Sequence, residues 1–363
     1  MKIICLFLEY MLDLFSFNWQ TNYLFFPIIS AFVFSLRYFA NNSISDNAKN
    51  PFFGSMIMFS SQLIFGSLLY YFQYKTKENQ KKPIKKISKV PLDYILNFSC
   101  ASLDLLSFTT LLFLSEVQPT KPLILRMTQS LFLVFLGIPI LHIELFRYHY
   151  VSIILTSTVM IIIMLIEGIF SDWTCLVLYL LSYFMNSLRY VLMKKEMQSC
   201  FYTAYKELMY QGLIGIFEMF IFIAIGNCFS IERVSFSNVK DAFFNISFRD
   251  SNVYLVIFIA GGCFNIINTK INETMSLLHV GITDTIAGLL FIFVKKEKDI
   301  TTIIDCILIV IIIISCLICT EVIICNFCGL KKDTTNAIIE RGKTEHLRLE
   351  EIINQDQDQS DED

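Results

Sequence analysis

The sequence predicts an all-α fold, a polytopic membrane protein that crosses the bilayer with about ten helices. The chain of 363 residues is 55% hydrophobic and only 17% charged, whereas soluble domains carry about 25% charged residues. A water-soluble protein of this size could not bury so much apolar surface, so the excess must face lipid. A spanning helix needs about 20 predominantly apolar residues. The stretches that approach this length are 22–40, 51–72, 93–114, 122–142, 150–167, 173–193, 207–226, 252–269, 275–294 and 301–325.

The distribution of basic residues predicts how these helices are oriented. Lys and Arg follow the even-numbered segments, most densely in KTKENQKKPIKKISK between the second and the third. Because positively charged loops stay on the cytoplasmic side, we expect both termini in the cytoplasm. Lys295, Lys296 and Lys298 run against this pattern, since they follow an odd-numbered segment. In this orientation the glycosylation sequons at Asn41 and Asn245 are lumenal.

The apolar segments divide the chain into two membrane halves with different flanking regions. We expect the first half at 20–167 and the second at 168–328, with five helices in each. Acidic residues interrupt the apolar run of residues 1–19, which favours an interfacial lead-in over a cleaved signal peptide. Residues 329–363 are polar, poor in aromatics and acidic at the end, which predicts a disordered cytoplasmic tail. A trafficking or partner motif within LRLEEII is the alternative reading of that tail.

The cysteines do not indicate a metal centre. Most of them lie inside apolar runs, where cysteine behaves as a small hydrophobic residue. The gap between Cys316-x-x-Cys319 and Cys325-x-x-Cys328 is far shorter than the roughly 15–20 residues of a zinc ribbon. We therefore expect no metal and no cofactor, and we interpret Cys325 and Cys328 as candidates for palmitoylation.

Ionisable residues within the apolar segments are the most informative feature. Asp104, Arg126 and Asp284 lie in the third, fourth and ninth segments, where a charge near the bilayer centre costs about 2.5–3.5 kcal/mol. Such residues pair with one another or line a polar pathway. One short loop joins the third and fourth segments, so we expect Asp104 to hold Arg126 in place when the site is empty. Arg37 and Arg189 lie near segment ends, where snorkelling to the interface is the alternative to a role in a site.

Neutral polar residues accompany these charges within the apolar segments. Interhelical hydrogen bonding explains such amides without any function, and a place in a shared polar chamber is the alternative. The residues concerned are Gln62, Gln129, Asn186, Gln211, Asn265 and Asn268.

Segments four and nine share a pattern that indicates an internal repeat. PTKPLILRMTQSLFLVFL and ETMSLLHVGITDTIAGLLFIF each begin polar, carry one ionisable residue early and end in Leu and Phe. The two segments lie five apart, so they enter the membrane from opposite faces. This arrangement predicts a five-plus-five inverted repeat, in which secondary transporters bind substrate near the midplane between the halves.

Several stretches carry a resemblance to a known family, in the order in which that family has them. They are FSLRY, NPFFGSMIMFSSQLIFG, SLDLLSFTTLLF, LILRMTQSLFLVFLGIPIL, YQGLIGIFEM and GGCFNIINTKINETMSLLHVGITDTIAGLL. Over residues 20–325 the chain resembles the drug/metabolite transporter superfamily. It is most similar to the F subfamily of solute carrier family 35, the nucleotide-sugar-transporter-like proteins, and more distantly to chloroquine-resistance-type transporters. Asp104 takes the family's acidic position and Arg126 its arginine.

The chain also departs from this family at charged positions. Gln62 and Gln211 stand where relatives carry Glu, and Met193 and Lys194 stand where relatives carry an acidic pair. These differences alter the charge of the polar chamber, so the identity of the substrate does not carry over.

The resemblance implies ten helices, cytoplasmic termini, alternating access and solute exchange in an internal membrane such as the Golgi, ER, lysosome or vacuole. Arg126, together with Arg37, would offer a guanidinium group to an anionic group of the solute. Asp284 would bind a cationic group or a coupling proton. The substrate-binding residues expected from the intramembrane charges and the resemblance are Arg37, Gln62, Asp104, Arg126, Asn265 and Asp284.

The expected function is secondary transport of a small polar, anionic metabolite, similar to a nucleotide sugar. The alternatives are a chloroquine-resistance-type carrier of amino acids, peptides or organic cations, and a non-transporting membrane scaffold. We expect no enzyme, because the sequence has no His-Glu-x-x-His, no Gly-x-Ser-x-Gly and no phosphate-binding loop. The expected partners are the solute and the lipid bilayer, with a homodimer as an open alternative. No block of Lys and Arg favours nucleic acid.

Overall fold

The computed structural model describes most of the apolar part of the chain. It describes residues 25–44, 50–78, 90–117, 125–143, 145–166, 168, 173–200, 203–228, 240, 244, 246–275, 277–294 and 300–319. Within these residues the regular secondary structure is helical, which confirms the predicted all-α class. The lead-in at 1–19, the tail at 329–363 and the residues Asn245, Cys325 and Cys328 lie outside the described residues.

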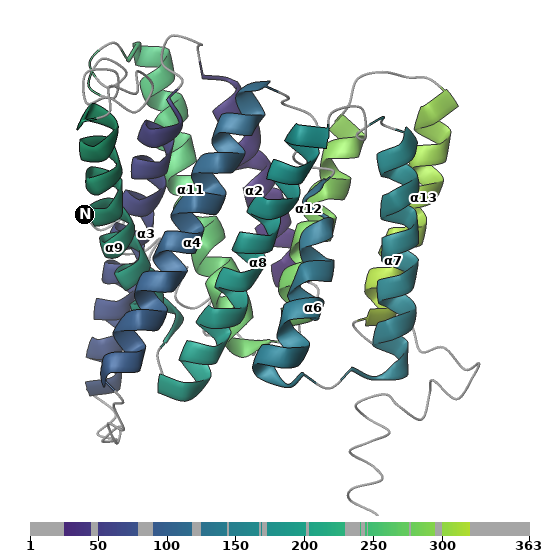
Figure 1. The fold of residues 1–363 in the computed structure, drawn as a ribbon, viewed down its shortest axis with the longest axis horizontal. Coiled ribbons are helices and arrows are strands. Elements are labelled where there is room, and N and C mark those ends of the chain that lie inside the picture. Colours follow the sequence, from purple (N-terminus) through teal and green to yellow (C-terminus); the bar gives the residue numbers. More distant parts are fainter. Residues whose placement is uncertain are drawn as a thin grey trace, which may run out of the picture. The chain divides into compact units, whose positions relative to one another are not determined.

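The predicted apolar segments each correspond to one helix of the described chain (Figure 1). The fourth segment begins later than predicted, because Arg126 lies in a turn and helix α6 starts only at Thr128. The helices are α2 (Phe25–Asn42), α3 (Pro51–Glu78), α4 (Val90–Val117), α6 (Thr128–Leu141), α7 (Arg147–Ile166), α8 (Trp173–Cys200), α9 (Ala204–Cys228), α11 (Phe248–Thr274), α12 (Leu277–Val294) and α13 (Ile300–Cys319).

Local sequence signals explain where two of these helices begin. Asn50 caps α3, since its Oδ1 accepts hydrogen bonds from the backbone N–H groups of Phe52 at 2.9 Å and Phe53 at 3.1 Å. Pro51 suits the first helical position because it has no N–H to leave unpaired. Ser247 caps α11 by accepting from the backbone N–H of Asp250 at 3.1 Å, and its hydroxyl donates to the Asp250 carboxylate at 2.6 Å.

The described residues divide into two compact units. The first comprises Met1–Ile143 and Met160–Cys306, and the second comprises Glu144–Val159 and Ile307–Asp363. In the first unit α3 packs against α9, α4 against α8, α2 against both α11 and α12, and α6 against both α8 and α12. Helix α3 also contacts α11, and α4 contacts α9.

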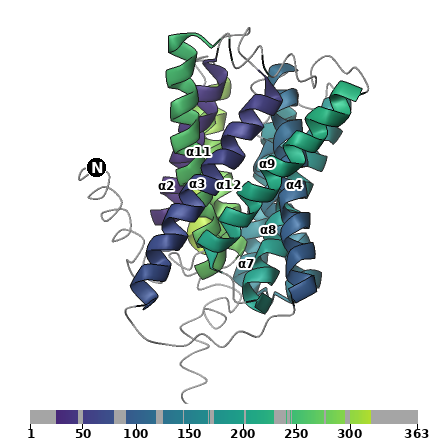
Figure 2. The same cartoon turned by 90° about the vertical axis from the view of Figure 1, so that its left-hand side faces the viewer.

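Glycines bring the backbones of α3 and α9 into close contact in the first unit. A Cβ atom on Gly66 of α3 would lie 2.7 Å from the backbone nitrogen of Met209 in α9. A Cβ atom on Gly212 of α9 would lie 2.4 Å from the backbone nitrogen of Leu63 in α3. The two backbones therefore touch, as small residues allow in membrane helix pairs, and Figures 1 and 2 both show α3 and α9 side by side.

The second unit is held together by hydroxyl groups between α7 and α13. Ser315 shares hydrogen bonds with the hydroxyl groups of Ser152 at 2.9 Å and of Thr156 at 2.7 Å. Ser152 also donates to the Ser315 carbonyl at 2.8 Å. These bonds satisfy polar groups where water is excluded.

The distribution of polar and apolar side chains is the reverse of that in a soluble protein. Large apolar side chains face outward, for example Phe32 at 64% exposure and Phe135 at 70%, whereas Gln62 and Asp284 are fully buried. By length and composition, six helices of the described chain are able to cross a membrane, and α2, α6 and α12 contribute shorter apolar helices. The chain is therefore an integral membrane protein. The six are Phe52–Lys75, Ile95–Leu114, His149–Ile166, Trp173–Ser199, Ala204–Ile225 and Phe248–Thr274.

Candidate functional site: a charged pocket among the helices

A cavity of about 860 Å³, open mouth included, lies within the first unit. Helices α2, α3, α4, α8 and α11 and the turn before α6 form its wall. Its wall combines three arginines with one aspartate and several aromatic rings.

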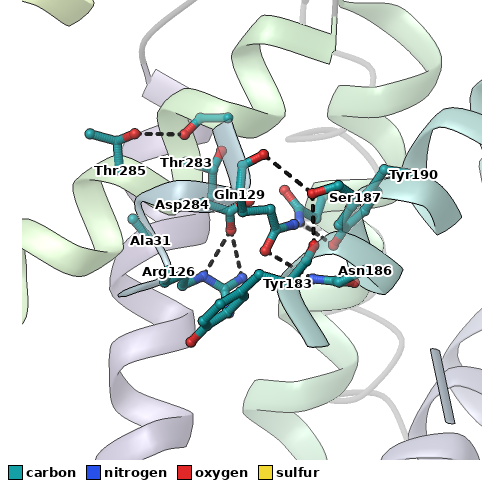
Figure 3. A network of polar contacts seen from close by, with 12 residues as sticks. Ala31, Arg126, Gln129, Tyr183, Asn186, Ser187, Tyr190, Thr283, Asp284 and Thr285 are labelled. Carbon is teal, nitrogen blue, oxygen red and sulfur yellow. Dashed lines mark hydrogen bonds and ion pairs between the residues drawn. The ribbon is translucent and has the colours of Figure 1, made fainter. Parts of the chain in front are cut away.

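Arg126 and Asp284 form a buried ion pair at the edge of this pocket (Figure 3). The Asp284 Oδ1 atom lies 2.6 Å from Nη2 and 2.8 Å from Nε of Arg126. Asp284 does not line the pocket itself, and its Oδ2 atom has no hydrogen-bond partner. On the pocket side, the Arg126 guanidinium lies 3.6 Å from the ring centre of Phe34, a cation–π contact. Asp284 therefore neutralises Arg126 while the guanidinium remains in the pocket wall.

Asp104 pairs with Arg189, and not with Arg126 as the sequence analysis expected. Arg189 also lines the pocket and its side chain is only 3% exposed, so the alternative in which it snorkels to the interface is wrong. The second carboxylate oxygen of Asp104 accepts a hydrogen bond from Gln62 Nε2 at 2.9 Å. Asp104 is thus held by one residue of α8 and one of α3.

Arg37 is the third arginine of the pocket, and its surroundings differ from those of the other two. It is buried, at 6% exposure, so it does not snorkel either. Its Nη2 atom lies 3.4 Å from the Met58 sulfur, and its guanidinium lies 4.4 Å from the ring centre of Phe108. Within the described part of the chain, no ion pair joins Arg37 to a carboxylate. Among the described residues, three guanidinium groups therefore accompany two carboxylates, and the charge of Arg37 is the one without a paired carboxylate.

The six residues predicted to bind substrate all lie in or directly behind this pocket. Arg37, Asp104, Arg126 and Asn265 line it. Gln62 and Asp284 lie behind the wall, where they hold Asp104 and Arg126 respectively. The Nδ2 atom of Asn265 is buried and has no acceptor, so the pocket contains an amide donor as well as the guanidinium groups.

Other buried amides connect helices, as the interhelical interpretation predicts. Asn186 of α8 donates to the Oε1 atom of Gln129 in α6 at 3.0 Å, and Ser187 donates to the Gln129 carbonyl at 3.2 Å (Figure 3). Asn268 of α11 donates to the hydroxyl of Tyr190 in α8 at 2.5 Å. These bonds fix α8, the helix that carries Arg189, against α6 and α11.

A short internal repeat links Arg37, which the sequence analysis placed in the site, to Arg189, which it left out. Ser-Leu-Arg-Tyr occurs at residues 35–38 in α2 and again at 187–190 in α8. Both copies place their arginine and their tyrosine in the pocket wall. The repeated tetrapeptide is the feature of the sequence that could have predicted Arg189 in the same pocket as Arg37.

Comparison with known proteins adds no assignment. No family model matches the chain, and no curated protein is significantly similar to it. The function must therefore be argued from the pocket and the fold.

Proposed function

We propose that this protein is a secondary transporter that moves a small polar, anionic metabolite across an endomembrane by alternating access, with both termini in the cytoplasm. The observation that supports it best is Arg37, a buried cation in the pocket wall with no carboxylate paired to it. A buried charge without a counter-ion is costly. An anionic solute removes this cost on binding, so the pocket favours anions over the organic cations of the alternative carrier.

The repeated tetrapeptide Ser-Leu-Arg-Tyr supports the same conclusion, because the arginines of its two copies have different neighbours. Arg189 in one copy faces Asp104 of α4, the third of the ten helices in chain order. Arg37 in the other copy faces Gly261 of α11, the eighth helix. A Cβ atom on Gly261 would lie 3.7 Å from Arg37 Cδ. The helix that corresponds to α4 therefore presents a glycine to Arg37, where α4 presents a carboxylate to Arg189, and the solute supplies the missing negative charge.

Helix packing supports a five-plus-five inverted repeat with ten crossings. In such a repeat, each helix of the first five corresponds to the helix five places later in the chain. If every helix is replaced by its counterpart, an observed helix contact of the first unit becomes another observed contact of the same unit. The contact of α4 with α8 becomes that of α11 with α2, α6 with α8 becomes α12 with α2, and α3 with α11 becomes α9 with α4. Halves related in this way rock against each other around a central site in secondary transporters.

The aromatic lining supports a solute with a flat ring. Phe34 stacks near Phe264, with ring centres 5.2 Å apart, and both rings lie against the Arg126 guanidinium. Tyr38, Phe108, Tyr183 and Tyr190 complete an aromatic wall. Rings of this kind stack on nucleobases, so a nucleotide or a nucleotide sugar would match both the charge and the aromatic lining of the pocket.

Ligand-induced stabilisation of the purified protein tests this proposal. A ligand that binds only the folded state raises the unfolding temperature in a concentration-dependent way. We expect anionic nucleotides or nucleotide sugars to stabilise the wild type, and amino acids and small organic cations to have no effect. We expect that such a ligand then moves into proteoliposomes that contain the protein. Stabilisation by organic cations alone, or binding without flux, would contradict the proposal.

Gly261 offers a matched pair of variants for the charge argument. Gly261→Asp places a carboxylate beside Arg37, in the position that Asp104 occupies for Arg189, and we expect it to abolish anion-induced stabilisation. Gly261→Asn has the same shape without the charge and retains most of the effect. Equal responses of the two variants would show that Arg37 does not bind the anion.

A further inference from the structure

Two buried carboxyl groups meet outside the pocket, between α8 and α9. Glu196 of α8 and Glu207 of α9 are both fully buried. Their carboxyl oxygens and the sulfur of Cys100 in α4 all lie within 4.8 Å of one another. Nothing in the proposed anion pocket uses these residues.

The neighbours of these carboxyl groups donate hydrogen bonds but leave acceptors unfilled. Asn97 Nδ2 donates to Glu196 Oε1. Gln211 Nε2 donates to Glu207 Oε1 at 2.8 Å, which places the Gln211 carboxamide directly against the pair. The Oε1 atom of Gln211 and the Oε2 atom of Glu207 are buried and accept no hydrogen bond. Gln211 Oε1 and Glu207 Oε2 therefore lack a hydrogen-bond donor among the described residues.

The charged groups around the cluster do not neutralise both carboxylates. Glu207 forms no ion pair within the described residues. Arg189, a cation of α8 that acts on Glu207, is already paired with Asp104. Two adjacent anions among apolar side chains repel each other and lose hydration. The titratable groups packed around the cluster are Tyr70 of α3, Cys100 and Asp104 of α4, Arg189 of α8, Lys206 of α9, and Lys270 and Glu273 of α11.

We infer that Glu196 and Glu207 share one proton and form a proton-binding site of this protein. A hydronium ion transfers its proton to one carboxylate and leaves as water, and the new O–H group donates to the other carboxylate. The charge of the pair changes from two negative charges to one, and release of the proton reverses the step. Asn97 and Gln211 each donate to the Oε1 atom of one carboxylate, which leaves Glu207 Oε2 for the shared proton.

One face of α4 connects this site to the pocket. Asn97 contacts Glu196, the Cys100 sulfur lies 3.8 Å from the Arg189 carbonyl, and Asp104 pairs with Arg189. These three α4 residues lie on one helix face, with about 10 Å along the axis from the first to the last. Protonation of the pair thus acts on the helix that positions Arg189. Its role as the coupling site for solute movement rests on the proposed function.

Infrared spectroscopy of the full-length protein in detergent tests the proton directly. A protonated carboxyl group in an apolar site has a C=O stretching band, which shifts on exchange into D₂O. We expect the wild type to show this band at neutral pH and to lose it in alkaline buffer. Glu196→Gln and Glu207→Gln should each remove the band, and Glu273→Gln, outside the pair, should retain it. A wild-type spectrum without the band, or a band that survives both substitutions, overturns the inference.

The pH dependence of stability gives a second readout that needs no solute. A proton held by the folded pair and released by the unfolded chain makes stability fall as pH rises. Glu207→Gln imitates the protonated state, so its unfolding temperature should fall less than that of the wild type between neutral and alkaline pH. Parallel curves for the two proteins contradict the inference. So does a wild-type stabilisation by added Zn²⁺ that Glu207→Gln loses, because the cluster would then bind metal.

These readouts separate the two proposals. If the infrared band behaves as expected but no anion stabilises the protein, the proton site stands and the carrier proposal fails. If anions bind and move but the band is absent, the carrier stands and the proton site fails.

Discussion

Arg189 and Asp104 form a buried ion pair that joins α8 to α4 beside the pocket. Gln62 adds a hydrogen bond from α3 to the same carboxylate, so one aspartate links three helices. Breaking such a pair from one side leaves a charge without its partner where water cannot reach it.

Asp104→Asn should therefore lower the free energy of unfolding by about 3–5 kcal/mol, the usual effect of removing one partner of a buried pair. Denaturant titration of the purified protein measures this change. The double variant Asp104→Asn with Arg189→Met should lose less than Asp104→Asn alone, because no uncompensated guanidinium remains. A double variant that is less stable than Asp104→Asn would contradict this explanation.

Arg37→Gln should not lower the free energy of unfolding, in contrast to Asp104→Asn. No carboxylate pairs with Arg37 within the described chain, so removal of its charge relieves a desolvation cost and leaves no counter-ion behind. We expect unchanged or increased stability in the same titration, together with loss of anion-induced stabilisation. A loss of stability as large as that of Asp104→Asn would show that Arg37 is structural.

Gly212→Ala should destabilise the contact between α3 and α9. The added methyl group would lie 2.4 Å from the backbone nitrogen of Leu63, and a backbone atom cannot move aside like a side-chain tip. Overpacking of this kind costs about 1–3 kcal/mol, measurable as a lower unfolding temperature. Gly261→Ala is the matched control, because its methyl group would meet only side-chain atoms at 3.7 Å or more. Equal effects of the two variants would argue against a tight contact.

Lys194→Met should weaken the end of α11. The Lys194 ammonium donates to the carbonyls of Asn272 at 2.5 Å and Met275 at 2.8 Å, which the helix end leaves without intrahelical donors. Hydrogen bonds from a charged group contribute about 1.5–3 kcal/mol, so we expect a loss of that order in the unfolding free energy. Lys195→Met, on an exposed neighbouring side chain, should have little effect. Faster hydrogen exchange at the end of α11 in Lys194→Met alone would locate the change.

The sequence predicted the helices and the membrane class well, because both depend on local composition. It also identified the buried charges, since Asp104, Arg126 and Asp284 stand out within apolar runs. It did not predict which charges pair. Asp104 and Arg126 are close in sequence, yet α4 packs along α8 and Asp104 meets Arg189 there. A short loop shows that two helices follow each other in the chain, but it does not show which side chains of the two helices face each other. That depends on how all the helices pack.

The carboxyl pair escaped sequence analysis for a different reason. Glu196 follows Lys194 and Lys195 near a helix end, and Glu207 follows Lys206 at the start of the next helix. Charged residues in such places usually extend into water. Only the packing of α4 and α9 shows that both carboxyl groups are enclosed.

The glycine contact between α3 and α9 has a mechanical consequence for the proposed carrier. The backbones of α3 and α9 touch at Gly66 and Gly212, so the two helices cannot move closer together there. Neither glycine has a side chain that could rearrange. In the proposed carrier we expect this contact to act as a pivot, so that a small tilt about it gives a larger displacement at helices farther away. The pocket should open to either side of the membrane at those distant helices. A cross-link between α3 and α9 should therefore leave this opening possible.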